Sequence, residues 1–227
     1  MGPIHMAPAL RLREAVALAG HFPLLTGVTL EVAEGEIVHL HGPNGAGKTS
    51  LLRLCCGLVA LASGEAVVLG HDLALDRRAV RREVGLLGHA SFLYDELTGE
   101  ENVRFALRAS GLGSRESAVR ARGALERLGL TGRLATTPVA RLSAGQRRRV
   151  SLSVLLGRQP RLWLLDEPHA GLDQESRDLL DGIVAESREA GATVLLASHE
   201  LGRASAVADR AVRLAGGRVE TEPVRVA

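Results

Sequence analysis

The sequence predicts an α/β fold in which a mostly parallel core sheet carries an antiparallel β subdomain and a small α-helical subdomain. Two continuous apolar segments, Arg161–Pro168 and Ala192–His199, are separated by a helical stretch at Gln174–Glu189, which indicates parallel strands covered on both faces. Alternating apolar residues in Ala9–Val32 indicate antiparallel strands at the start of the chain. A helical pattern from Gly99 to Leu130 predicts the inserted helical subdomain.

The elements before the insert follow from local patterns. A turn is expected near Gly20–Pro23, where glycine and proline interrupt the first alternating segment. Gly35–His41 is interpreted as a short buried strand, and Lys48–Leu58 as the helix that follows it. Glu65–Gly70 alternates again and predicts a further strand, and Val84–Gly88 predicts another.

Four arginines gather on a short helical stretch between these last two strands: Arg77, Arg78, Arg81 and Arg82. Such a cluster is most often a solvated face, and contact with a partner or a membrane surface is the alternative. Beyond it, Thr98 and Ser114 are predicted helix caps, with a break between the helices at Gly111–Gly113.

Length and composition set the outer bounds. The chain has 227 residues, of which 46% are hydrophobic and 24% charged, values that are ordinary for a soluble globular protein. No apolar run approaches the ~20 residues that cross a bilayer and no signal peptide is visible, so we expect a cytoplasmic protein. A net charge of +2, with one Trp, one Tyr and three Phe, does not favour nucleic acid as a partner. Residues 1–5 are interpreted as a leader before the natural start at Met6, with a single domain at 6–227.

The segment that follows the strand at 35–41 fits the phosphate-loop pattern G-x-x-x-x-G-K-[ST] at every defined position. It consists of Gly42, Pro43, Asn44, Gly45, Ala46, Gly47, Lys48, Thr49 and Ser50. Its glycines allow tight turns that aim several N–H groups at one point, where the helix macrodipole also favours an anion. The only lysine of the chain, Lys48, is predicted to reach the β- and γ-phosphates, and the Thr49 hydroxyl to coordinate Mg²⁺.

Polar residues end two of the predicted parallel strands. Asp166 and Glu167 follow one apolar run, and His199 follows the other. Because ligands bind at the carboxyl ends of parallel strands, these three side chains are candidate site residues. A phosphate loop with an acidic strand end fits many nucleotide hydrolases and kinases.

A further segment narrows this choice. Arg141–Val150 resembles the L-S-G-G-Q signature of ATP-binding cassette ATPases, with alanine in place of the first glycine. The resemblance covers Ala9–Val219 and implies a phosphate-loop NTPase fold of the ATP-binding cassette type, with its helical signature subdomain at about 90–158. Five motifs stand in that family's order: the phosphate loop, the signature, Asp166-Glu167, Ala170–Asp173 and His199.

The resemblance implies a role for each strand-end residue. Asp166 would hold Mg²⁺ through water, together with Thr49. Glu167 would act as the general base that polarises the attacking water, and His199 would contact the γ-phosphate and that water. With Lys48, these two form the predicted catalytic set.

The resemblance implies that the signature does not contact the nucleotide bound by its own phosphate loop. Ser143, Ala144, Gly145 and Gln146, at the N-terminus of a helix, would meet the γ-phosphate of ATP bound by the opposite subunit. Two ATP molecules would then lie between the subunits of a head-to-tail dimer with twofold symmetry. Asp173 would lie at the same seam and couple the two sites.

Two positions depart from the family pattern. The family carries a glutamine after the strand at 84–88, where it contacts Mg²⁺ and couples nucleotide to the membrane partner, and here His89 takes that place. Histidine can still ligate or donate, so coupling that depends on pH is expected. The family also stacks adenine on an aromatic residue at the position of Ala19. Phe22 is a candidate substitute, and selectivity for ATP over GTP is left open.

A single cassette with a short helical insert resembles the separate ATPase subunit of a membrane transporter, peripheral on the inner face of the cell membrane. Leu86–Thr98 and Glu100–Phe105 are similar to the haem-exporter ATPase subunit of cytochrome c maturation, and drug, polysaccharide and lipid exporters share much of this run. The groove around His89 to Glu101 is expected to receive the coupling helix of a membrane-spanning subunit. The alternatives are a soluble cassette ATPase of translation or DNA repair and a phosphate-loop kinase.

Overall fold

The computed structural model describes residues 8–88 and 91–220, and these divide into two compact units. The first unit contains residues 8–88, 160–168 and 183–220. The second contains residues 91–159 and 169–182. Each unit has its own hydrophobic core.

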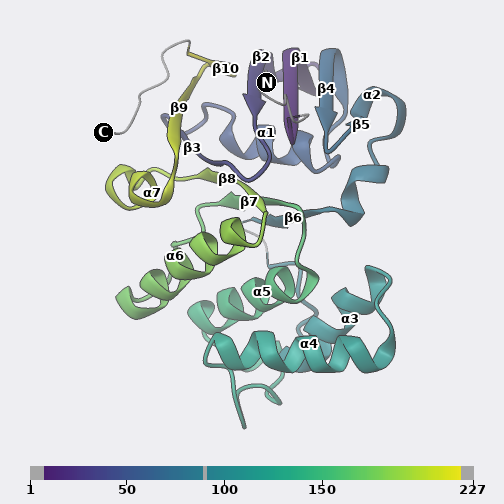
Figure 1. Cartoon of the computed structure of the whole chain (residues 1–227), viewed down its shortest axis with the longest axis vertical. Helices are drawn as coiled ribbons and strands as arrows, with labels where there is room; N and C mark the ends of the chain where they lie inside the picture. The colour runs from purple at the N-terminus through teal and green to yellow at the C-terminus, as the bar shows by residue number, and fades with distance from the viewer. Residues whose placement is uncertain (1–7, 89–90, 221–227) are drawn as a thin grey trace, which may run out of the picture. The chain divides into compact units, whose positions relative to one another are not determined.

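The first unit contains the predicted parallel sheet (Figure 1). Its six strands follow the order β10-β9-β3-β8-β7-β6, and all neighbours are parallel except β9 and β10. The prediction of a mostly parallel core sheet is therefore confirmed. The strands are β3 (Ile37–His41), β6 (Val84–Leu87), β7 (Leu162–Asp166), β8 (Thr193–Ala197), β9 (Arg210–Ala215) and β10 (Arg218–Val219).

The same unit contains the predicted antiparallel sheet, in the order β2-β1-β4-β5. The turn between β1 and β2 lies at Gly20 and His21, within the predicted range. The strand predicted at 65–70 begins four residues earlier, at Leu61, and ends at Val68. Its first half is mostly exposed, so the sequence there lacks the apolar alternation that indicates a strand. The strands are β1 (Leu10–Ala19), β2 (Phe22–Val32), β4 (Leu61–Val68) and β5 (His71–Asp72).

Helix α1 (Lys48–Cys55) lies between the two sheets and contacts β1, β2 and β4 of one and β7 and β8 of the other. Its Leu51, Leu52 and Leu54 are fully buried in the core that both sheets share. Burial of each leucine side chain contributes about 1.5–3 kcal/mol. The core thus fixes the helix whose N-terminus closes the phosphate loop.

The predicted end of this helix at Leu58 is wrong, since α1 ends at Cys55. The N–H of Gly57 bonds to the carbonyl of Leu54, and the N–H of Leu58 bonds to that of Arg53, which is a Schellman cap. Gly57 has a φ of +69°, and a Cβ there would lie 1.9 Å from the carbonyl oxygen of Arg77. The chain must therefore leave the helix at this glycine.

The second unit is helical. Its helices α3 (Gly99–Ala109), α4 (Ser114–Arg127) and α5 (Ala144–Arg158) contact one another pairwise. The short 3-10 helix η2 (Val139–Arg141) precedes α5. Buried apolar residues from all of these elements form the core: Val103, Leu107, Ala121, Leu125, Leu130, Val139, Leu142 and Val150.

Of the two predicted caps, one is confirmed and one is wrong. Thr98 caps α3 through a capping box with Glu101. Ser114, in contrast, is the first helical residue of α4, and Gly113 takes the N-cap position without a side-chain bond. Gly113 already has the extended conformation of an N-cap, so the serine after it falls inside the helix.

The remaining helices connect the strands of the first unit or link the two units along the chain. The predicted helical stretch of four arginines is not one helix. Arg77 and Arg78 lie in a turn after α2 (Leu73–Asp76), and Arg81 and Arg82 lie in the 3-10 helix η1 (Ala79–Arg82). Helix α6 (Gln174–Glu189) has the predicted bounds and contributes residues to both units. Helix α7 (Leu201–Val207) follows β8. Within the described ranges, no helix is long and apolar enough to cross a membrane.

Candidate functional site

The phosphate loop connects the end of β3 to the start of α1, as the sequence predicts. Gly42 has a φ of +146°, and a Cβ there would lie 2.0 Å from the carbonyl oxygen of Leu214. Gly47 has a φ of +103°, and its Cβ would lie 2.9 Å from the carbonyl oxygen of Leu24. Only glycine fits these two positions, because both the conformation and the close backbone exclude a side chain.

Lys48 points back into this loop. Its ammonium donates to the carbonyl of Gly42 over 2.8 Å and to that of Pro43 over 3.2 Å. The residue is 8% exposed, so the only lysine of the chain lies within the loop and not on the surface. A positive charge and the N-terminus of α1 therefore face the same point, which suits an anion.

Thr49 and Asp166 meet although they come from different elements. The Thr49 hydroxyl, in the first turn of α1, donates to the Asp166 carboxylate over 2.7 Å. Asp166 is buried at the carboxyl end of β7. A hydroxyl and a carboxylate are the hard oxygen donors that Mg²⁺ takes from proteins, so these residues fit that ion. Among the described residues, no group of three or more His, Cys, Asp or Glu forms a metal cluster, and Mg²⁺ here would also need phosphate and water oxygens.

Glu167 and His199 form a second pair at the same edge of the sheet. The His199 Nδ1 donates to a Glu167 carboxylate oxygen over 2.9 Å, and their side chains are 67% and 16% exposed respectively. Glu167 has a φ of +45°, which is unusual for a residue with a side chain. Its N–H bonds to the carbonyl of Ala197 over 2.8 Å, which holds this turn against β8.

The signature residues begin helix α5 in the second unit. Ser143 is the N-cap, and its hydroxyl accepts the N–H of Gln146 over 3.2 Å. The Gln146 side-chain oxygen accepts the Ser143 N–H over 2.9 Å, which completes a capping box. The first helical residues, Ala144 and Gly145, present backbone N–H groups at a helix N-terminus.

Asp173 lies in the turn before α6, also in the second unit. Its carboxylate accepts the N–H of Ser176, and hydrogen bonds from the Ser176 side chain and backbone lower the pKa of this carboxyl. Gly171 of the same turn lies against the signature, since a Cβ on Gly145 would be 3.2 Å from the Gly171 carbonyl oxygen. The two segments that the sequence assigns to a dimer seam are therefore neighbours within the second unit.

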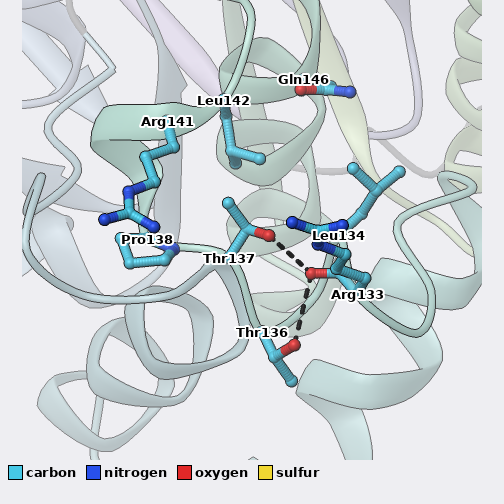
Figure 2. Close-up of a pocket in the computed structure, with 8 residues that line it drawn as sticks. All are labelled: Arg133, Leu134, Thr136, Thr137, Pro138, Arg141, Leu142 and Gln146. Atoms are coloured by element: carbon cyan, nitrogen blue, oxygen red, sulfur yellow. Dashed lines mark hydrogen bonds between the residues drawn. The ribbon is translucent and has the colours of Figure 1, made fainter.

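A cavity of about 750 Å³ lies beside the signature, and Leu142 and Gln146 of the signature line it. Figure 2 shows the hydroxyls of Thr136 and Thr137 bonded to the Arg133 carbonyl on one side of it, over 3.3 and 2.7 Å. The residues that line it are Arg133, Leu134, Thr136, Thr137, Pro138, Arg141, Leu142 and Gln146.

Two further sets of candidate residues come from the positions that depart from the family pattern. His89 lies outside the described residues. Ala19 and Phe22 face each other across the β1–β2 turn, and Phe22 is 78% exposed, so its ring is accessible.

Comparison with known proteins relates these features to one family. Residues 25–170 match the sequence profile of the ABC transporter family, in which ABC stands for ATP-binding cassette. The chain belongs to the ABC transporter family. As an ABC ATPase it binds ATP, and its hydrolysis of ATP is coupled to transport.

Relatives of this ABC ATPase carry different names. The cytochrome c biogenesis ATP-binding export protein CcmA of Aromatoleum aromaticum is 41% identical over 198 residues, which cover 87% of this chain and 91% of the relative. The daunorubicin resistance ATP-binding protein DrrA3 of Streptomyces coeruleorubidus is 40% identical over 200 residues, which cover 87% of this chain and 62% of the relative.

The bacterial ABC transporter cassette MJ0796 has the same fold. Its dimeric structure has a TM-score of 0.87 at 26% identity and covers 96% of this chain and 100% of that chain. A second dimeric structure, a post-hydrolysis state bound to ADP and Pi, has a TM-score of 0.84 at 27% identity with the same coverage.

Proposed function

We propose that this ABC ATPase powers export through a separate membrane-spanning subunit and acts as a head-to-tail dimer that binds two ATP molecules. The relatives named for export and for drug resistance support the direction of transport. The dimeric structures of a cassette with this fold support the assembly. The protein would then be cytoplasmic and peripheral on the inner face of the cell membrane, held there by its partner.

The observation that carries the hydrolytic role is the 2.9 Å contact between Glu167 and His199. The carboxylate of Glu167 would accept a proton from the attacking water. Because His199 uses Nδ1 for this contact, the opposite edge of its ring is directed away from Glu167 and can meet the γ-phosphate. One hydrogen bond would then align the base and the phosphate sensor.

The phosphate loop and the Thr49–Asp166 pair would hold the nucleotide. Lys48 would exchange its bonds to loop carbonyls for bonds to the β- and γ-phosphates. Bound Mg²⁺ would neutralise phosphate charge between Thr49 and Asp166. These residues orient the phosphates while Glu167 acts on water.

The signature would complete the site of the opposite subunit. The Ser143 hydroxyl accepts a bond within its own capping box, and a hydroxyl that accepts can still donate to phosphate. The N–H groups of Ala144 and Gly145 would add to this donor set. Asp173, beside them in the same unit, would make contacts across the seam and couple the two sites.

An aromatic surface in the second unit would receive the membrane-spanning subunit. The rings of Tyr94 and Phe105 meet edge to face, with their centroids 5.1 Å apart, and both side chains are about half exposed. Phe92, two residues before Tyr94, is also exposed. These residues belong to the stretch that is similar to haem-exporter subunits, and an exposed apolar patch of this kind suits a coupling helix.

The transported substrate is proposed from the relatives. Haem export in cytochrome c maturation agrees with the CcmA likeness and with the run at 86–105. The 40% identity to DrrA3 favours a drug exporter almost equally, and lipid and polysaccharide exporters remain alternatives.

The hydrolytic role is tested with Glu167→Gln. We expect this variant to hydrolyse Mg-ATP at least about 100-fold more slowly while still binding ATP. The matched control is Glu189→Gln, which removes the same charge from an exposed position at the end of α6. Equal hydrolysis by Glu167→Gln and the control would show that Glu167 is not the base.

The transport role is tested by recovering the chain with its partner from membranes in mild detergent. A cytochrome c maturation membrane subunit in the recovered complex would support haem-linked export. A drug or lipid permease would keep the mechanism and change the substrate. An active ATPase that recovers no membrane protein would contradict the export proposal.

A further inference from the structure

His39 is an imidazole at the centre of an apolar strand. It occupies the third position of β3, directly before the phosphate loop, and is 0% exposed. Both ring nitrogens have partners: Nε2 lies 3.2 Å from the carbonyl oxygen of Ser198, and Nδ1 lies 3.5 Å from the hydroxyl of Ser205. Buried polar side chains in folded proteins are normally hydrogen-bonded, and both ring nitrogens of His39 follow this rule.

The partners determine which nitrogen carries the proton. A carbonyl oxygen only accepts, so Nε2 must be the donor to Ser198. In the neutral ring Nδ1 is then the acceptor, and the Ser205 hydroxyl donates to it. Burial lowers the pKa of His39, which keeps this neutral form at neutral pH.

The carbonyl that His39 holds lies beyond the regular ladder of the sheet. The pairing of β3 with β8 ends at Leu40 and Ala197, and Ser198 follows as a buried residue. A buried carbonyl needs a donor, and His39 provides it. The Ser198 N–H bonds to the Leu40 carbonyl over 3.3 Å, so β3 holds Ser198 at both its N–H and its carbonyl.

This carbonyl belongs to the peptide group that connects Ser198 to His199. Its plane sets the direction in which the chain enters His199, whose side chain then reaches the Glu167 carboxylate over 2.9 Å. The Ser198 hydroxyl accepts the N–H of Glu200 over 3.0 Å and supports the other side of the same turn. All these contacts lie within the first unit.

We propose that His39 is a positioning residue for His199: it fixes the Ser198–His199 peptide from the strand that leads into the phosphate loop, and so aligns His199 with Glu167. This inference rests on the proposed hydrolytic function. It makes β3 a shared support, because the same strand carries the phosphate loop at one end and orients the side chain that would sense the γ-phosphate.

The test compares two replacements in the full chain. His39→Leu keeps bulk in the core and removes the donor, and His39→Gln restores an N–H near the position of Nε2. We expect His39→Leu to lower kcat for Mg-ATP by about tenfold to hundredfold, with KM for ATP changed by less than about threefold. His39→Gln should recover most of the loss. The matched control is His71→Leu, a histidine of the same unit that bonds to Glu83 over 2.7 Å, and it should leave kcat unchanged.

A double-mutant cycle shows whether His39 acts through His199. In a His199→Ala background, His39→Leu should cause no further loss of kcat. Ser205→Ala, which removes only the hydroxyl facing Nδ1, gives a milder second variant should His39→Leu not fold. It should lower kcat by about twofold to fivefold, and again only when His199 is present.

Three results would overturn the proposal: unchanged kcat in both His39→Leu and Ser205→Ala, a loss in His39→Gln as large as in His39→Leu, or losses that add to that of His199→Ala. Failure of the proposed function would give a different result. If His199→Ala itself hydrolysed ATP at the wild-type rate, the role of His199 would be wrong, whatever the His39 variants did.

Discussion

The hydroxyl of Thr49 donates to the carboxylate of Asp166 over 2.7 Å, across a separation of 117 residues. Thr49 lies in the first turn of α1 and Asp166 ends β7, and β8 lies between β3 and β7 in the sheet. The contact therefore depends on the order of the parallel strands, which brings the ends of β3 and β7 to the same edge. The two motifs that the sequence shows separately become one oxygen site through this topology.

This pair gives the first prediction. Thr49→Val keeps the shape of the side chain and removes the bond to Asp166, so the free energy of unfolding should fall by about 1.5–3 kcal/mol in urea titrations without nucleotide. The variant should also lose the additional stability that Mg-ATP confers. Thr49→Ser keeps the hydroxyl and should retain both. Full stabilisation of Thr49→Val by Mg-ATP would contradict the assignment of Thr49 to the metal.

The backbone of Glu167 gives the second prediction. At a φ of +45° a glycine is under less strain than a residue with a Cβ. Although Glu167→Gly and Glu167→Ala both lose the carboxylate, Glu167→Gly should be more stable by about 1 kcal/mol, measured by thermal and urea unfolding. At an ordinary helix position the order is reversed. A more stable alanine variant would show that the turn is not held in the left-handed conformation.

The third prediction concerns pH. Burial lowers the pKa of His39 and of His41 below the ordinary value of 6.5. The unfolded chain therefore binds protons near this pH that the folded chain does not, and the free energy of unfolding should rise with pH through about 5.5 to about 7.5. Urea unfolding at several pH values measures this slope. His39→Gln removes one of the two groups and should reduce the slope, and an unchanged slope would show that His39 does not contribute to it.

The fourth prediction separates the fold of the signature from its function. Ser143→Ala and Thr98→Ala each remove the N-cap of a capping box in the same unit. Each should lower stability by about 1 kcal/mol. Only Ser143→Ala should also weaken the ATP-dependent dimer, measured by analytical ultracentrifugation in a Glu167→Gln background. Equal dimerisation of the two variants would show that Ser143 makes no contact with nucleotide on the opposite subunit.

Features that depend on neighbouring residues could be predicted from the sequence. The phosphate loop, the apolar strands that lead to Asp166 and His199 and the helix cap at Thr98 are local patterns, and the structure shows each of these elements. The motif order also identified the family. These patterns can be recognised in the sequence because each is defined by a few residues that lie close together in the chain.

Features that depend on distant contacts could not be predicted. Helix α1 ends early because Gly57 lies against the backbone of Arg77, 20 positions away, and no local pattern shows this contact. His39 looks like a polar interruption of a strand until Ser198, 159 residues later, is placed beside it. Strand β9 lacks strong alternation and β10 has only two residues, so their pairing depends on the sheet that is already formed.

The placement of Lys48 has a practical consequence for chemical labelling. Because every other fixed cation in the chain is arginine, amine-reactive reagents meet a single side-chain target, and that target lies within the phosphate loop. Covalent labelling at this amine therefore reports on the loop alone, without the background from surface lysines that most proteins present. Lysine-directed modifications, such as acetylation, can likewise reach only one side chain on this chain, Lys48, and there they would block the loop.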